Sequence, residues 1–193
     1  AQSGMDAVTH CVEAYASLAH NRLSDRAALS SIGTAWRSIE RFVDDPSDPD
    51  AGTDMAYAAL EAGMAFTNAI LGATHAMSHP VGGLCDAAHG AINSVLLPHV
   101  IRFNAQTDPT PYVELASVVG VSGGTPHAIA ERLADEVASL ARRVGLPADL
   151  RSLGVRDEHV GVLTANALLD ACMTTNPRKP TAHDVSRIYR EAL

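Results

Sequence analysis

Three observations predict an all-α protein, a bundle of many helices. Every segment with a clear hydrophobic period has the 3.6-residue period of a helix, and no segment alternates convincingly as a strand. Apolar residues make up 47% of the 193 residues, but aromatic residues only 4%. The core must therefore be built from Ala, Leu, Val and Met, and alanine-rich chains favour close-packed helices. At this length we expect one domain, residues 1–193.

Capping and turn residues place the elements of the first half of the chain. Ser3 and Asp6 resemble a capping box that opens the first helix. Pro80 and the pair Gly82-Gly83 are expected to end a long apolar helix whose C-terminal half carries two histidines. The expected helices are 3–19, 24–42 and one from residue 53 to about 79, with an acidic, proline-broken loop at 44–50.

The second half of the chain predicts shorter helices separated by proline and glycine. His89 opens a helix that Pro98 should kink, because proline removes the backbone hydrogen bond to Ser94. Thr125 caps a charged amphipathic helix that stops at Gly145. Further helices are expected from residue 108, near 147–153, at 157–171 and from Thr181 onward, with loops at 120–124 and 176–180.

Charge and cysteine usage exclude several classes of function. The formal net charge of −8 argues against nucleic acid or an anionic membrane as a partner, because phosphate binding needs a basic face. No apolar run approaches the roughly 20 residues of a membrane span. Three widely spaced cysteines without a CxxC motif are typical of reduced thiols, so we expect a cytoplasmic protein. The chain begins at Ala1 and enters a helix at once, from which we expect it to be part of a longer protein.

A group of histidines and one carboxylate predicts a metal site. His75, His79 and His89 fall within fifteen positions, and Asp6 and His10 stand four apart near the start. Two groups at i and i+4 lie on one face of a helix, which suits residues that must meet one cation. One carboxylate with several imidazoles is a ligand set for a first-row transition metal, and Fe²⁺ and Zn²⁺ both fit it. Spacing alone nominates His79 as a partner of His75 and leaves open which of these residues bind.

Other motif-like features have simpler interpretations. Cys85 lies between two of these histidines and is a weaker candidate ligand. The run of glycines at 120–124 lacks a preceding strand, so it is a loop and not a phosphate-binding turn. Ordinary surface or core roles are expected for the remaining histidines, His20, His99, His127, His159 and His183.

Several motifs of the chain resemble those of one enzyme family. Gly4-Met-Asp-Ala-Val-Thr-His10, followed by Glu13-Ala-Tyr15, looks like the segment that opens their helical domain. Residues 62–68, His75-Ala-Met-Ser-His79-Pro, His89-Gly90 and residues 96–100 resemble the family signature. Asn176-Pro-Arg178 and Ile188-Tyr189 match its C-terminal end, so the likeness covers essentially the whole chain. The family that these motifs resemble is that of the iron-containing (group III) alcohol dehydrogenases.

This resemblance implies a specific site. Such enzymes have an N-terminal α/β domain that holds NAD or NADP and an all-α, dehydroquinate synthase-like C-terminal domain that holds the metal. This chain resembles only the second domain. The resemblance assigns the metal to Asp6, His10, His75 and His89, and places His79 beside the nicotinamide and substrate. Phe66 is expected either to line the apolar side of the pocket or to belong to the core.

The implied activity is the interconversion of a small alcohol and an aldehyde or ketone by metal-assisted hydride transfer to NAD(P). His79 would position the cofactor or relay the alcohol proton. Fe²⁺ is the metal that the resemblance favours, with Zn²⁺ as the alternative, and the full-length enzyme is expected to be a homo-oligomer. Without the N-terminal domain, the chain alone is predicted to be inactive. Two other functions stay open: a non-catalytic metal-binding helical domain, and a zinc-dependent glycerol-type dehydrogenase on the same fold.

Overall fold

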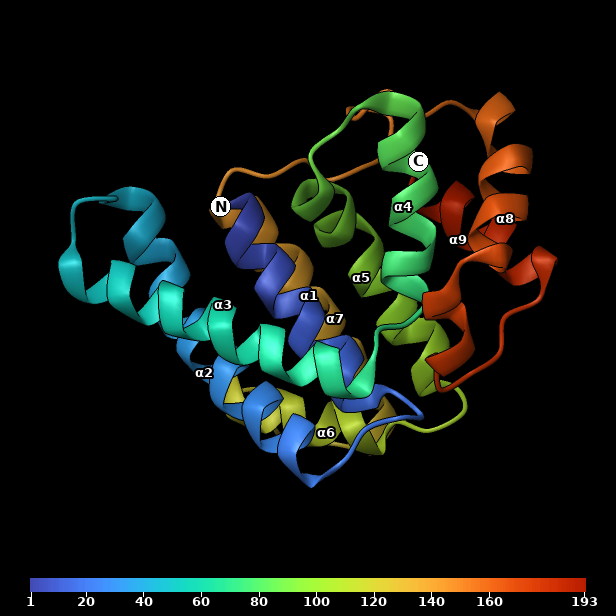
Figure 1. Cartoon of the computed structure of the whole chain (residues 1–193). Coiled ribbons are helices and arrows are strands. Elements are labelled where there is room, and N and C mark those ends of the chain that lie inside the picture. Colours follow the sequence, from blue (N-terminus) through green and yellow to red (C-terminus); the bar gives the residue numbers. More distant parts are fainter.

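The computed structural model describes residues 1–193 and is built from helices without a strand, which confirms the predicted all-α class (Figure 1). Two short 3₁₀ helices lie at Asp157–His159 and Ala171–Thr175. The α-helices are α1 (Gln2–Ala16), α2 (Arg22–Asp44), α3 (Pro49–Ala69), α4 (Ala73–Cys85), α5 (His89–Ala105), α6 (Thr110–Val118), α7 (Pro126–Arg143), α8 (Val160–Leu169) and α9 (Ala182–Glu191).

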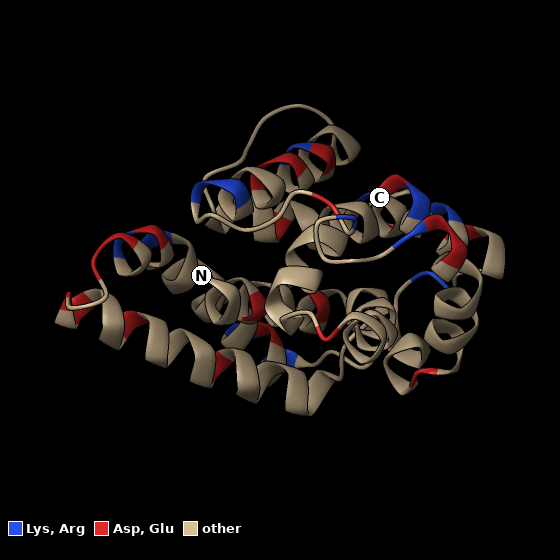
Figure 2. Cartoon of the chain, turned by 90° about the horizontal axis from the view of Figure 1, so that it is seen from above, with Lys and Arg blue, Asp and Glu red and all other residues tan.

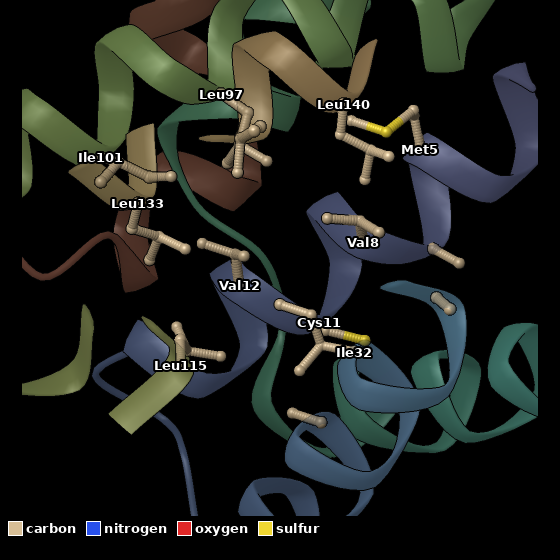
Figure 3. Packing of buried hydrophobic residues seen from close by; sticks show 14 of the residues in the cluster. Met5, Val8, Cys11, Val12, Ile32, Leu97, Ile101, Leu115, Leu133 and Leu140 are labelled. Carbon is tan, nitrogen blue, oxygen red and sulfur yellow. The ribbon is translucent and has the colours of Figure 1, made fainter. Parts of the chain in front are cut away.

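The first of two hydrophobic clusters surrounds α1. This helix is buried on nearly every side, with ten of its fifteen residues inside the protein. In Figure 3, Val12 of α1 points toward Leu97 and Leu133, while Cys11 lies beside Ile32 on the other side. A helix that is buried on several sides needs packing partners on each of them, and α2, α3, α5 and α6 all contact α1. The core is assembled mainly from Ala, Leu, Val, Ile and Met, close to what the composition predicts.

The second cluster joins α4, α8 and α9 to another side of α5. Helix α5 contributes to both clusters, since Leu97 and Ile101 belong to the first and Leu96 and Val100 to the second. Helices α1 and α4 therefore both lie against α5 (Figure 1). The four candidate ligands and His79 are on these three helices, so the site forms where the two clusters meet.

The predicted helix from residue 53 to 79 is wrong, because the chain breaks between α3 and α4. Ile70 ends α3 with a φ of 61°, an unusual backbone angle for a β-branched residue. Side chains distant in sequence fix this break. The Ser17 hydroxyl donates to the Ala69 carbonyl at 2.5 Å, and the Thr175 hydroxyl donates to the Leu71 carbonyl at 2.6 Å. His75 and His79 consequently lie on a separate helix whose direction is set independently of α3.

The predicted end of the histidine helix is also wrong. Helix α4 continues through Pro80 and both glycines to Cys85, and Asp86 closes it in the left-handed conformation with φ 50°. A proline inside a helix removes one backbone hydrogen bond and distorts the turn before it. Tyr189 of α9 donates its hydroxyl to the Met77 carbonyl at 2.6 Å in this turn, so tertiary contacts hold the helix together there.

Several other boundaries differ from the predicted ones. Helix α1 ends at Ala16, and no side chain caps its start, so the proposed capping box with Asp6 does not form. Helix α2 begins at Arg22 because Asn21 and Ser24 form the capping box. Residues 147–153 form turns and not a helix. The predicted starts at His89, after Thr125 and after Thr181 are confirmed, and Pro98 lies inside α5 as expected.

Charged residues are spread over the outer helices, with basic and acidic positions interspersed (Figure 2). Some of them connect helices. Arg102 of α5 lies 2.8 Å from Glu131 and 2.5 Å from Asp135, which are one turn apart on α7. None of the helices combines the length and the apolar character that crossing a bilayer requires.

Candidate metal centre

Helix α1 brings a carboxylate and an imidazole to the place where it meets α4 and α5. Asp6 and His10 are one turn apart, and Oδ2 of Asp6 lies 3.9 Å from Nδ1 of His10. Both side chains are largely buried, with exposed fractions of 23% and 17%. The i, i+4 spacing read from the sequence therefore places both on one face of α1, as predicted.

Helices α4 and α5 bring two further imidazoles to the same carboxylate. Oδ1 of Asp6 lies 3.7 Å from Nε2 of His75 and 3.6 Å from Nε2 of His89. Ligand atoms of Asp6, His10 and His75 all lie within 4.8 Å of one another. His75 is 1% exposed and His89 41% exposed, so the group is closed on the side of His75 and open on the side of His89. The four residues named by the resemblance come together here.

The Asn93 side chain tests whether this group fits a metal ion. Its amide nitrogen lies 2.7 Å from Oδ1 of Asp6, 3.1 Å from Nε2 of His75 and 3.0 Å from Nε2 of His89. An amide NH₂ has two hydrogens, whereas three potential acceptors converge on it. Its Oδ1 atom is buried without a partner. Once His75 is deprotonated, these are three lone-pair atoms, more than one donor group can satisfy, and with His10 beside them they fit a divalent cation of the Fe²⁺ or Zn²⁺ type.

The protonation states of Asp6 and His10 suit metal binding. Burial alone would raise the pKa of Asp6, but hydrogen bonding from His75 and Asn93 and the field of the nearby imidazoles bring it down to about 2. Burial lowers the pKa of His10 to about 4, because the attraction of Asp6 offsets only part of the desolvation. At neutral pH this pair is therefore an anionic carboxylate and a neutral imidazole with a free lone pair, the forms that bind metals.

His75 and His89 differ from each other in protonation. Burial would lower the pKa of His75, but the carboxylates of Asp6 and Glu13 on either side of its ring raise it to about 9. Burial lowers the pKa of His89, and repulsion from the neighbouring histidines adds to this effect. In the absence of a cation, His75 thus holds a proton between two carboxylates at neutral pH, and a metal would have to displace that proton.

His79 lies next to the four-residue group but has a different partner. Its Nδ1 is 2.7 Å from Oδ2 of Asp170, at the start of the second 3₁₀ helix. The His79 ring stacks on the His89 ring with 5.5 Å between centroids, and it is 43% exposed. Helical spacing alone had nominated His79 as a ligand with His75. In the structure its ring is engaged by Asp170 at the open edge of the group.

Asp170, His79 and Cys172 form a second group of potential ligands within 4.8 Å of one another. Two features make it a poor cation site. The 2.7 Å separation between His79 and Asp170 is that of a direct hydrogen bond. Burial and the nearby Asp170 charge raise the pKa of the Cys172 thiol to about 12, so it holds its proton.

Phe66 contacts both the candidate ligand group and the core. Its ring stacks on the His10 ring with 4.5 Å between centroids, and it also packs against the first hydrophobic cluster.

Cys85 is half-buried and is absent from both groups of potential ligands. The three cysteines are free thiols, as expected. His20 pairs with Asp25 at the surface, and His99 lies 4.0 Å from Glu191, so neither joins the site.

Three residues at the site were not singled out from the sequence. Asn93 follows His89 by four positions on α5, so helical spacing could have nominated it. Glu13 was quoted only as part of a motif, although it bonds to the His75 ring. Asp170 lies 91 positions from His79, and no local pattern connects the two.

Comparison with known proteins identifies relatives of the whole chain. Residues 1–193 match the sequence model of the Fe-containing alcohol dehydrogenase family, C-terminal part. The 1,3-propanediol dehydrogenase of Klebsiella pneumoniae is 40% identical over 195 residues, which is 100% of this chain and 50% of that enzyme. Alcohol dehydrogenase 4 of Schizosaccharomyces pombe is 40% identical over 193 residues, 100% of this chain and 45% of that protein.

A solved structure gives the same result for the fold. The crystal structure of a 1,3-propanediol oxidoreductase superposes with a TM-score of 0.97 at 40% sequence identity. The match covers 100% of this chain and 51% of that chain. The chain thus spans about half the length of the curated relatives it matches.

Proposed function

Because the chain belongs to the iron-containing alcohol dehydrogenase family, we propose that it is the metal-binding catalytic half of an NAD(P)-dependent alcohol dehydrogenase. Such an enzyme interconverts an alcohol with an aldehyde or ketone. The observation that carries this proposal is the convergence of Asp6, His75 and His89, from three different helices, on the amide of Asn93. His10 completes the group from α1.

The proposed metal ligands are Asp6, His10, His75 and His89. Fe²⁺ is the first candidate because of the family, and Zn²⁺ is the second, since one carboxylate with three imidazoles suits either ion. A divalent ion held there supplies Lewis-acid polarisation of an alcohol or carbonyl oxygen. The open side of the group, between His79 and His89, is where a substrate oxygen would enter.

His79 is the proposed catalytic residue. Its Nδ1 is engaged by Asp170, so in the neutral ring that nitrogen donates and Nε2 is left with a lone pair. A ring oriented in this way can accept a proton from a substrate hydroxyl or return it to a carbonyl, either directly or through water. Asp170 holds the ring in place. Burial would raise the pKa of Asp170, but hydrogen bonds from His79 and Cys172 lower it, so it stays anionic.

The proposed substrates are small alcohols and aldehydes, and the proposed cofactor is NAD or NADP. Two relatives are named for 1,3-propanediol and lactaldehyde, both small polar molecules. The dinucleotide would be held mainly by an N-terminal nucleotide-binding domain outside this chain. The chain itself covers only half the length of its relative. Leu169, next to Asp170, is 85% exposed, and Leu84 on α4 is 46% exposed. A domain packed over this side would bury such apolar side chains. We also propose that the full-length enzyme is a homo-oligomer.

A panel of small alcohols, assayed with NAD⁺ and NADP⁺ before and after metal removal, tests this function. The chain joined to its nucleotide-binding domain should oxidise at least one alcohol, lose that activity with a chelator, and regain it with Fe²⁺ or Zn²⁺. The 193 residues alone should be inactive. Hydride transfer needs the donor carbon and the nicotinamide ring held about 3–3.5 Å apart, and we propose that the dinucleotide is held mainly by the nucleotide-binding domain. Full activity after complete metal removal would contradict the proposal.

A further inference from the structure

Glu13 is a buried carboxylate whose contacts all go to the start of α4. It lies on α1, one turn beyond His10, and its side chain is 4% exposed. Oε1 accepts the backbone N–H of Thr74 at 2.6 Å, and Oε2 accepts those of Gly72 at 3.1 Å and His75 at 3.3 Å. Oε2 also lies 2.7 Å from Nδ1 of the His75 ring. Burial would raise the pKa of Glu13, but these hydrogen bonds and the field of His75 lower it.

The start of α4 depends on side chains from elsewhere in the chain. Gly72 is its N-cap residue and offers no side chain. Glu13 accepts three of the first four amide groups, and Oδ1 of Asn176 accepts the remaining one, that of Ala73, at 3.0 Å. A Cβ atom at position 72 would lie 2.8 Å from Asn176 and 3.1 Å from Glu13, so only glycine leaves room for both. A carboxylate at a helix N-terminus is also favoured by the helix dipole.

The hydrogen bond between Glu13 and the His75 ring also determines which ring nitrogen faces the candidate metal site. With Nδ1 of His75 directed at a carboxylate 2.7 Å away, this nitrogen keeps its hydrogen, and the lone pair of the deprotonated ring is on Nε2. Nε2 is the atom that lies 3.7 Å from Asp6 and 3.1 Å from Asn93. Asp6, His10 and Glu13 all belong to α1, so one helix carries two candidate ligands and the group that aims a third.

We propose that Glu13 is a positioning residue of the metal centre: it fixes the orientation and tautomer of His75 so that Nε2 faces the metal. This inference rests on the proposed function, since it takes His75 as a ligand. Partners of this kind orient metal-bound histidines, and their loss typically lowers metal affinity by about 10–100-fold. Glu13 acts through His75 and does not touch the substrate.

Asn176 provides the matched control, because it caps the same helix without touching the imidazole. Glu13→Gln keeps the size of the side chain but replaces one acceptor oxygen with a donor. We expect Zn²⁺ affinity, measured by competition with a chelator, to fall by about 10–100-fold in E13Q. In N176A the expected loss is of global stability, measured by urea unfolding, with a much smaller change in affinity.

Ring ¹⁵N shifts of His75 in the zinc-loaded protein give a readout that a purely structural role would not move. In the wild-type protein Nδ1 should carry the hydrogen and Nε2 should be the coordinated atom, a measurement that needs no variant. E13Q should weaken or reverse this pattern. Zinc bound through Nδ1 in the wild type, or equal affinity in wild type and E13Q, would overturn the inference about Glu13 while leaving the metal centre in place. Absence of metal binding by the wild type would contradict the proposed function itself and this inference with it.

Discussion

Nδ1 of His79 lies 2.7 Å from Oδ2 of Asp170, although the two residues are 91 positions apart. The contact joins α4 to the second 3₁₀ helix at the edge of the candidate metal-ligand group. It defines which nitrogen of His79 faces outward, and with it the direction in which this ring can exchange a proton.

Replacing Asp170 by Asn should lower kcat by about tenfold or more while leaving metal content unchanged. The side-chain amide of Asn has no negative charge with which to hold the His79 ring in place. General acid–base catalysis is sensitive to such changes in the orientation of the ring. The assay is steady-state alcohol oxidation by the enzyme assembled with its nucleotide-binding domain, alongside metal analysis. The exposed pair His20–Asp25, separated by 3.0 Å, offers the control D25N, which should have wild-type kcat. A normal kcat in D170N would remove Asp170 from the proposed mechanism.

His89→Ala should abolish stoichiometric metal binding. His89 is the most exposed of the four candidate ligands, so its removal disturbs the core least. His99→Ala is the matched control, because His99 is on the same helix and outside the ligand group. Metal content per chain, measured by elemental analysis after dialysis, should be near zero in H89A and unchanged in H99A. Undiminished metal in H89A would remove this residue from the site.

Metal affinity should rise between pH 7 and pH 9. The pKa of His75 is raised to about 9 in the folded chain, above its ordinary value of 6.5. The proton on His75 therefore stabilises the metal-free fold fully below pH 6.5, and this contribution is lost as the pH rises through about 9. A metal has to displace the proton, so the apparent affinity should increase by about tenfold per pH unit in this window.

His10 adds no further slope in that range, because burial lowers its pKa to about 4 and it is already neutral. Chelator competition with Zn²⁺ at a series of pH values measures the slope. An affinity independent of pH between 7 and 9 would mean that His75 carries no proton to displace.

Gly90→Ala should destabilise the protein and weaken the metal centre together. A Cβ atom at position 90 would clash with the Gln2 carbonyl oxygen and lie 3.2 Å from Cβ of Asp6, so α1 and α5 would have to separate. We expect a loss of about 2 kcal/mol or more in the free energy of unfolding. Gly83→Ala, at a helical position with open space around it, should instead gain about 0.5–1 kcal/mol. Urea unfolding measures both, and equal effects of the two substitutions would contradict the close approach at Gly90.

The sequence predicts the helical class well because the apolar period is a local property of each segment. The capping residues Thr125 and Thr181 each accept a hydrogen bond from the amide three positions away, and the helices they begin are confirmed. The break between α3 and α4 has no such local cause. It is made by Ser17, Glu13 and Thr175, which reach the 69–75 segment from distant parts of the chain.

The candidate site shows the same division. The pair Asp6 and His10 follows from helical spacing, since both residues are on one helix. Spacing places His79 on the same face of α4 as His75, but in the structure the His79 ring bonds to Asp170. We propose His89, on another helix, for the fourth place, and only resemblance to a family could assign it. Asn93 lies four positions after His89, so helical spacing predicts that the two share a face of α5.

The most direct test of the central claim is anomalous scattering from crystals of this protein grown with Fe²⁺ or Zn²⁺, measured on both sides of the metal's absorption edge. The account predicts one peak per chain, within coordination distance of Asp6, His10, His75 and His89, with His79 turned toward Asp170. A peak located instead among His79, Asp170 and Cys172, the second group of potential ligands, or no peak at all at saturating metal, would contradict it.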